Sequence, residues 1–303
     1  MRDQIIKKIF NDVSYIISKY DYFIEGKIDK ILKGHTSVIT CMSILPNGQI
    51  VTGSTDNTCI IWKINGEIDT ICKGHTNYVT CVNVLSNGQI VSGSYDKTLI
   101  IWKDKRVGKV LKGHTDYINC VNILPNGQII SGSWDESLII WKDNGEIDKV
   151  LKGHTNNVTC VSVLLNGQII SGSDDNTCII WKLNGEVDKV LKGHTHWVKC
   201  VNVLPNGQIV SGSWDNTCIL WRPNSEEIDK ILIGHMNWVR SISILPNGHI
   251  VSGSQDTTCI IWTKSGEIAK VLKGHQNNIT CISVLPNGQI VSGSHDKTCI
   301  IWK

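Results

Sequence analysis

The fold is decided by residues 34–62, which read GHTSVITCMSILPNGQIVTGSTDNTCIIW. In this stretch Asp56 follows His35 by 21 residues, and Trp62 follows the Asp by six. The same spacing occurs seven times, with 39 to 41 residues between successive His residues. The seven sets are His35, Asp56, Trp62; His75, Asp96, Trp102; His114, Asp135, Trp141; His154, Asp175, Trp181; His194, Asp215, Trp221; His235, Asp256, Trp262; and His275, Asp296, Trp302. Self-similarity at such a period is typical of repeat architectures, in which each repeat is one supersecondary unit.

Each unit is predicted to contain four short antiparallel strands. In the first unit these are residues 38–45, 49–54, 58–63 and 67–72, with turn signals at Pro46-Asn47-Gly48 and Asn65-Gly66. The third strand is continuously apolar, as expected of a sheet that is covered on both faces. The fourth strand mixes apolar and charged residues, as in 28–33, which suits an outer edge that resists pairing with other chains.

Gly-His, Asp and Trp at these spacings resemble the WD-repeat propeller family, and the resemblance covers residues 27–303. The sequence departs from the family in the residue after each Trp, which is Lys, Arg or Thr. The resemblance implies an all-β fold, a seven-bladed β-propeller of four-stranded antiparallel blades. Since the repeat region opens with a fourth strand (27–33) and closes with a third (298–303), we expect the first to complete the last blade.

Residues 1–26 are predicted to be a separate extension. Apolar residues follow a helical period there, so residues 3–20 should form a short amphipathic helix. Two roles remain open for it: packing against the propeller, or binding a partner or a second copy of a propeller that is otherwise monomeric. Charges interrupt every apolar run in this region, which argues against a signal peptide or a membrane span. We therefore expect a cytoplasmic or nuclear protein.

The composition indicates a large packed hydrophobic core and does not favour a particular class of partner. The chain has 41% hydrophobic and 19% charged residues, and its net charge of +3 is too small to indicate polyanion binding. Eleven of the twelve cysteines occupy two repeated positions. We interpret them as small buried hydrophobic residues in a reducing compartment, because equivalent positions of successive blades lie too far apart for disulfides.

A hydroxyl stands four residues before each Asp of the repeats. These residues are Thr52, Ser92, Ser131, Ser171, Ser211, Ser252 and Ser292. The resemblance implies that Trp, hydroxyl, His and Asp of each blade form a structural chain of hydrogen bonds. A hydrolase with a Ser/His/Asp triad is the alternative, but seven equal copies favour structure over catalysis. We expect no cofactor, no phosphate-binding loop and no metal, since His194 and His196 have no third ligand nearby.

The repeats differ from one another at three positions: three and five residues after the His, and directly before the Asp. The resemblance implies that these positions line the top face of the ring around its central channel. Every aromatic residue outside the extension and the network tryptophans occurs there, namely Tyr78, Tyr95, Tyr117, Trp134, Trp197, Trp214 and Trp238. The same positions carry Asp174, Lys199, Arg240 and His295. Tyr and Trp dominate binding hot spots, so exposed rings here predict a protein or peptide ligand. The alternative is that the rings plug the channel.

The predicted function is that of a non-catalytic protein-interaction scaffold, in which Lys199 and Arg240 would pair with acidic groups of the partner. Segments such as 211–215 (SGSWD) and the Leu-Pro-Asn-Gly turns are similar to the ubiquitin-binding propeller of the phospholipase A2-activating protein family. Ubiquitin is therefore a candidate ligand by resemblance. A nucleic-acid-binding propeller is the alternative, but the sequence lacks a basic stripe.

Overall fold

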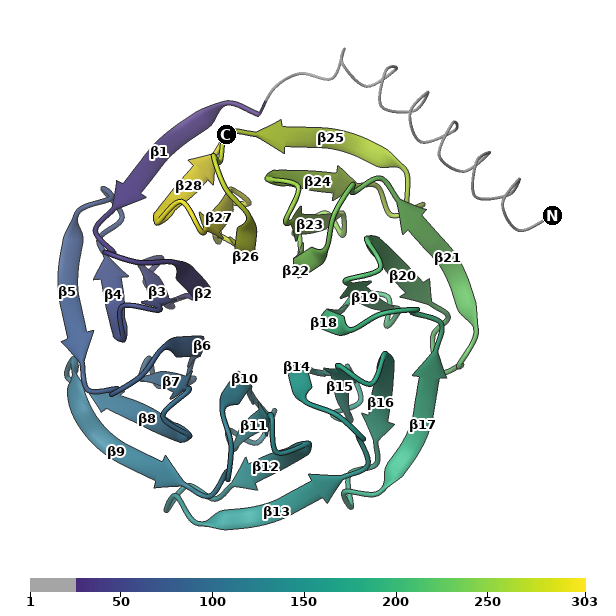
Figure 1. Ribbon diagram of the computed structural model, residues 1–303, viewed down its shortest axis with the longest axis horizontal. Helices are drawn as coiled ribbons and strands as arrows, with labels where there is room; N and C mark the ends of the chain where they lie inside the picture. Colours follow the sequence, from purple (N-terminus) through teal and green to yellow (C-terminus); the bar gives the residue numbers. More distant parts are fainter. Residues whose placement is uncertain (1–25) are drawn as a thin grey trace.

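The computed structural model describes residues 26–303, which form a ring of seven four-stranded antiparallel sheets around a central channel (Figure 1). This architecture confirms the predicted seven-bladed propeller. The helix predicted over residues 3–20 lies outside the described residues. Within residues 26–303, no helix has the length and hydrophobicity that a membrane crossing requires.

The four strands of a blade follow one another from the channel to the rim (Figure 1). The innermost strands are β2 (Ile39–Ile44), β6 (Val79–Val84), β10 (Ile118–Ile123), β14 (Val158–Val163), β18 (Val198–Val203), β22 (Val239–Ile244) and β26 (Ile279–Val284). The second strands are β3 (Ile50–Ser54), β7 (Ile90–Ser94), β11 (Ile129–Ser133), β15 (Ile169–Ser173), β19 (Ile209–Ser213), β23 (Ile250–Ser254) and β27 (Ile290–Ser294). The third strands are β4 (Thr58–Trp62), β8 (Thr98–Lys103), β12 (Ser137–Trp141), β16 (Thr177–Trp181), β20 (Thr217–Trp221), β24 (Thr258–Trp262) and β28 (Thr298–Trp302). The rim strands are β5 (Ile68–Lys73), β9 (Arg106–Lys112), β13 (Ile147–Lys152), β17 (Val187–Lys192), β21 (Ile228–Ile233), β25 (Ile268–Lys273) and β1 (Ile28–Lys33).

The ring is closed by strands from the two ends of the described chain. β1 pairs antiparallel with β28, with Leu32 opposite Cys299, so the sheet order is β1-β28-β27-β26. The backbone N–H of Lys303 donates to the carbonyl of Lys27 at 2.7 Å, and the Lys303 ammonium lies 2.9 Å from Asp29. Closure gives the last blade its fourth strand and leaves its third strand without a free edge.

The hydrophobic core lies between blades. One cluster joins Cys41 and Val51 of one blade with Val79 and Trp102 of the next, and the other six clusters likewise span neighbouring blades. The blades approach so closely that a Cβ on Gly53 would lie 2.6 Å from Val79 Cγ1. All twelve cysteines are buried free thiols. Since both faces of each sheet are covered, the apolar runs of the third strands are explained.

The two ends of each blade form the two faces of the ring. In the first blade the Asn47-Gly48 turn joins β2 to β3 at one face, while Thr55 and Asp56 follow β3 at the other. At this second face, the N–H of Thr55 donates to the carbonyl of Val38 at 3.0 Å. We call it the top face. It therefore carries two of the three positions at which the repeats differ, side by side in every blade.

Candidate functional site

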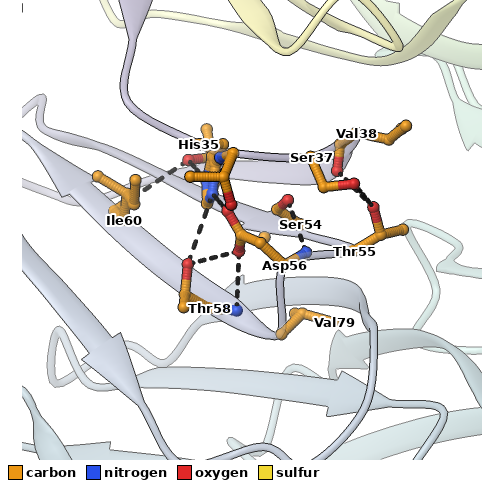
Figure 2. Close-up of polar contacts among 12 residues, drawn as sticks. His35, Ser37, Val38, Ser54, Thr55, Asp56, Thr58, Ile60 and Val79 are labelled. Carbon is orange, nitrogen blue, oxygen red and sulfur yellow. Dashed lines mark hydrogen bonds and ion pairs between the residues drawn. The ribbon is translucent and has the colours of Figure 1, made fainter.

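A chain of hydrogen bonds runs through the top of each blade, and Figure 2 shows part of the first one. The Trp62 indole N–H donates to Thr52 Oγ1 at 2.8 Å, and that hydroxyl lies 2.8 Å from His35 Nε2. On its other side, His35 Nδ1 lies 2.8 Å from Asp56 Oδ2 (Figure 2). A neutral imidazole with its proton on Nδ1 satisfies every donor and acceptor of this chain. The network that the resemblance implied is present in all seven blades.

The network aspartates also organise the adjacent backbone. Asp56 accepts hydrogen bonds from the N–H of Thr36 and from both the N–H and the hydroxyl of Thr58. Burial alone would raise the pKa of Asp56, but the hydrogen bonds from His35 and Thr58 lower that pKa well below its usual range. The pKa of Asp256 is lowered to about 2 in the same way, by its bonds to His235 and Thr258 against the opposing effect of burial. These aspartates are therefore held ionised by the fold.

None of the seven network hydroxyls is exposed: Thr52 and its six serine counterparts have 0% of their surface accessible. A nucleophile must reach its substrate, and each of these hydroxyls already bridges an indole and an imidazole. The geometry consequently explains the repeated Ser/His/Asp sets as structural groups. Within residues 26–303, no group of three or more His, Cys, Asp or Glu side chains is placed to hold a metal ion.

The structure divides the top-face aromatic residues into two groups. The tyrosine cluster consists of Tyr78, Tyr95, Tyr117 and Trp134, from the blades of β6–β9 and β10–β13. Tyr95 stacks on Tyr117 with ring centroids 4.2 Å apart, and Trp134 lies 5.6 Å from Tyr95 and 5.1 Å from Tyr117. Tyr78 extends the group outward, at 5.7 Å from Tyr95.

The tryptophan cluster consists of Trp197, Trp214 and Trp238, from the blades of β18–β21 and β22–β25. Trp214 stacks on Trp238 at 3.7 Å with an interplanar angle of 10°, and Trp197 lies 4.5 Å from Trp214. Because the rings cover one another, the three tryptophans are half-buried. Among the seven top-face aromatic residues, only Tyr78 is exposed, with 45% of its surface accessible. The expectation of freely exposed tryptophans is corrected in this respect, because the rings of each cluster pack against one another.

Between the clusters lies the mouth of the channel, a cavity of about 480 Å³. Tyr95 and Trp134 line it from one cluster, and Trp197 and Trp214 from the other. Asp174, Lys199, Arg240 and His295 line it as well, whereas Tyr78, Tyr117 and Trp238 stand outside it. The structure thus brings eight of the eleven predicted residues to one cavity and places the other three beside it.

Lys199 is already paired within the protein. Its ammonium lies 2.6 Å from Asp174, which is 5% exposed and also accepts a hydrogen bond from Asn157. The ammonium also lies 4.7 Å from the Trp197 ring and 4.6 Å from the Trp214 ring. Burial lowers the pKa of Lys199, although Asp174 opposes that shift. Asp174 thus supplies a counter-charge for Lys199 within the protein, and the contact of Lys199 with a partner stays a prediction.

Arg240 has a different environment. Its guanidinium lies 5.5 Å from the Trp214 ring, and among residues 26–303 it forms no ion pair and its side chain makes no hydrogen bond. Burial lowers the pKa of Arg240, while the nearby Tyr95 opposes this. The pKa of His295 is lowered by its own burial and then by the charge of Arg240. The channel mouth therefore contains one cation whose charge no carboxylate of the described chain balances.

The position five residues after each His has a structural role that sequence reasoning missed. Thr40 Oγ1 lies 2.5 Å from the carbonyl of Val79 in the next blade, and Thr80, Thr159 and Thr280 make the same contact with their neighbours. Asn119 reaches the equivalent carbonyl at 3.4 Å. Lys199 and Arg240 occupy this position in the other two blades without making the contact. The recurrence of Thr was the signal that could have shown this role.

Comparison with known proteins agrees with this geometry. The family described as "WD domain, G-beta repeat" matches residues 26–63, 66–103, 105–142, 145–182, 185–222, 227–263 and 266–303. Among solved structures, the crystal structure of the WD40 beta propeller domain of Doa1, from the phospholipase A2-activating protein family, is similar with a TM-score of 0.86. Identity is 25%, over 93% of this chain and 98% of that one. No curated protein sequence matches. Seven matched repeats in seven closed blades show that the chain belongs to the WD-repeat family.

Proposed function

We propose that this propeller is a non-catalytic scaffold that holds a protein or peptide on its top face. The observation that carries the proposal is the pair of packed aromatic clusters flanking a cavity of about 480 Å³. Tyr and Trp bury large areas at small cost in conformational entropy, and hot spots concentrate on such residues. The proposed contact residues are Tyr78, Tyr95, Tyr117, Trp134, Asp174, Trp197, Lys199, Trp214, Trp238, Arg240 and His295.

Ubiquitin is the candidate ligand that we propose to test first. Its support is the likeness to the Doa1 propeller, together with the resemblance of the 211–215 segment to ubiquitin-binding propellers. The two competing functions have less support in the geometry. A hydrolase would require an accessible hydroxyl among the network groups, and these are buried. A nucleic-acid binder would require several free cations beside the rings. Within residues 26–303, Lys97 lies 6.0 Å from the Tyr117 ring but also 3.8 Å from Asp116, and Lys199 is paired with Asp174, which leaves Arg240 as the cation beside the rings without an ion pair. Location in the cytoplasm or nucleus remains part of the proposal.

The test is calorimetric titration of the protein with monomeric ubiquitin. Trp214→Ala and Trp238→Ala should each weaken binding about thirtyfold, corresponding to roughly 2 kcal/mol for a central hot spot. Asn47→Ala and Leu165→Ala are the controls, because both residues lie in turns of the opposite face and Leu165 is 72% exposed. Undiminished binding by both Trp variants would refute the site.

If the wild-type protein does not bind ubiquitin, ubiquitin is refuted as the ligand. The scaffold proposal is then tested on a purified partner found by comparing affinity captures with wild-type and Trp238→Ala protein. A partner that binds both forms with equal affinity would place recognition elsewhere on the molecule.

A further inference from the structure

We propose that the partner inserts one carboxylate into the channel mouth, where Arg240 binds it between the two aromatic clusters. This inference rests on the proposed function and adds the chemistry of the group that the site recognises. Three independent features of the cavity support it: its charge, its unpaired hydrogen-bond donors, and the residue type that Arg240 replaces.

The charge of the cavity corresponds to a single negative group. Three of its lining residues carry full charges: Asp174, Lys199 and Arg240. Asp174 and Lys199 neutralise each other at 2.6 Å, which leaves the guanidinium of Arg240. A carboxylate carries one negative charge, whereas a phosphate group carries about 1.5 to 2 negative charges and would need a second cation to balance them. Lys199 is held by Asp174, so a carboxylate fits the available charge better.

Most polar side chains around the cavity have hydrogen-bond partners, but three donor groups lack an acceptor. Among buried side-chain atoms, Trp134 Nε1, Trp214 Nε1 and Arg240 Nε have no partner in the described chain. All three residues line the cavity. An ionised carboxylate accepts hydrogen bonds and donates none, and its bonds to a guanidinium are frequently bidentate. Small rearrangements of the two indoles toward such a group would satisfy donors that the protein itself leaves unpaired.

Arg240 also occupies the position at which four other blades carry a Thr that donates a hydrogen bond to the next blade. Thr280, one blade further on, donates across to the carbonyl of Ile39, and the corresponding carbonyl for Arg240 is that of Ile279. No side chain of the described residues donates to Ile279 O. A half-buried cation without an anion and without the contact between blades is poorly explained by folding alone. Binding an anion explains it.

The test follows the indole N–H signals of Trp134 and Trp214 by NMR during titration with short blocked peptides. Ac-Ala-Ala-Glu-Ala-Ala-NH2 should shift both signals in a saturable way, and its Gln counterpart should bind at least tenfold more weakly. A peptide whose only carboxylate is its free C-terminus shows which source of carboxylate the site prefers. Arg240→Gln should abolish the response, and Arg222→Gln, on an exposed arginine paired with Glu227, should retain it.

Three results would overturn the inference: equal binding of the Glu and Gln peptides, tighter binding of a phosphoserine peptide than of the Glu peptide, or an undiminished response in Arg240→Gln. The seven network indoles report in the same spectra whether each variant is folded, and Arg240→Thr is a second variant that removes the charge. Failure here differs from failure of the proposed function. If Trp238→Ala loses the partner while Arg240→Gln keeps it, the top-face site stands and the carboxylate contact is wrong.

Discussion

Replacing Arg240 by Thr should stabilise the propeller. The change removes a buried cation without a counter-charge and places a hydroxyl where Thr40, Thr80, Thr159 and Thr280 donate to the next blade. A hydrogen bond of this kind contributes about 1 kcal/mol net, and removing a buried polar group without a partner relieves about 1 kcal/mol more. Against this stands the lost contact with the Trp214 ring, about 0.5 to 1 kcal/mol. The expected net gain is about 1 kcal/mol.

The gain is measured as the free energy of unfolding in urea and as the melting temperature, which should rise by about 2 °C in a chain of this size. Thr280→Val is the matched comparison, since it removes the same hydrogen bond from the next blade and should cost about 1 kcal/mol. A loss of 1 kcal/mol or more in Arg240→Thr would refute the reasoning, because it would show that Arg240 supports the fold.

Three further predictions concern the fold itself. Deleting residues 1–33 should lower the melting temperature far more than deleting residues 1–24, because it removes the strand that pairs with β28; equal melting temperatures would contradict the role of closure. His154→Ala or Asp175→Ala should cost roughly 1 to 3 kcal/mol in urea unfolding, since each leaves a network group unpaired; an unchanged value would exclude that role. The lowered aspartate pKa values mean that the unfolded chain binds more protons near pH 4, so stability present above about pH 4 is lost as the pH falls toward 2. In urea unfolding at pH 5, 4 and 3, Asp256→Asn should therefore lose less stability than the wild type, and parallel curves would oppose this account.

Most of the fold could be predicted because the same pattern of strands and turns occurs seven times in the sequence. The strands of the first unit, expected at 38–45, 49–54, 58–63 and 67–72, lie at Ile39–Ile44, Ile50–Ser54, Thr58–Trp62 and Ile68–Lys73. Each strand is bounded by turn residues, and each apolar run is covered on both sides by equivalent neighbours. Each repeat therefore supports the strand assignment made for the others.

The arrangement of the top-face residues was less predictable, because it depends on contacts between different blades. Comparing the repeats found Lys199 and Asp174, but not their ion pair, which joins positions 25 residues apart. The same comparison placed Trp197, Trp214 and Trp238 on one surface, but not the stacking that half-buries them. Both contacts depend on the directions in which the side chains point, and these directions cannot be read from a pattern of residue types.

Closure through β1 and β28 also sets an order of events during synthesis. About 265 residues separate the two strands, so at roughly 5 to 20 residues per second β1 leaves the ribosome some 13 to 53 seconds before its partner. During that time β1 is an unpaired strand whose Ile31 is 48% exposed even in the finished ring. Lys30 and Lys33 flank this residue, and charge on an unpaired strand discourages association with other nascent chains. The lysines of β1 therefore act before the ring has closed, by discouraging aggregation of the unpaired strand. The last blade can form only after β28 has been synthesised.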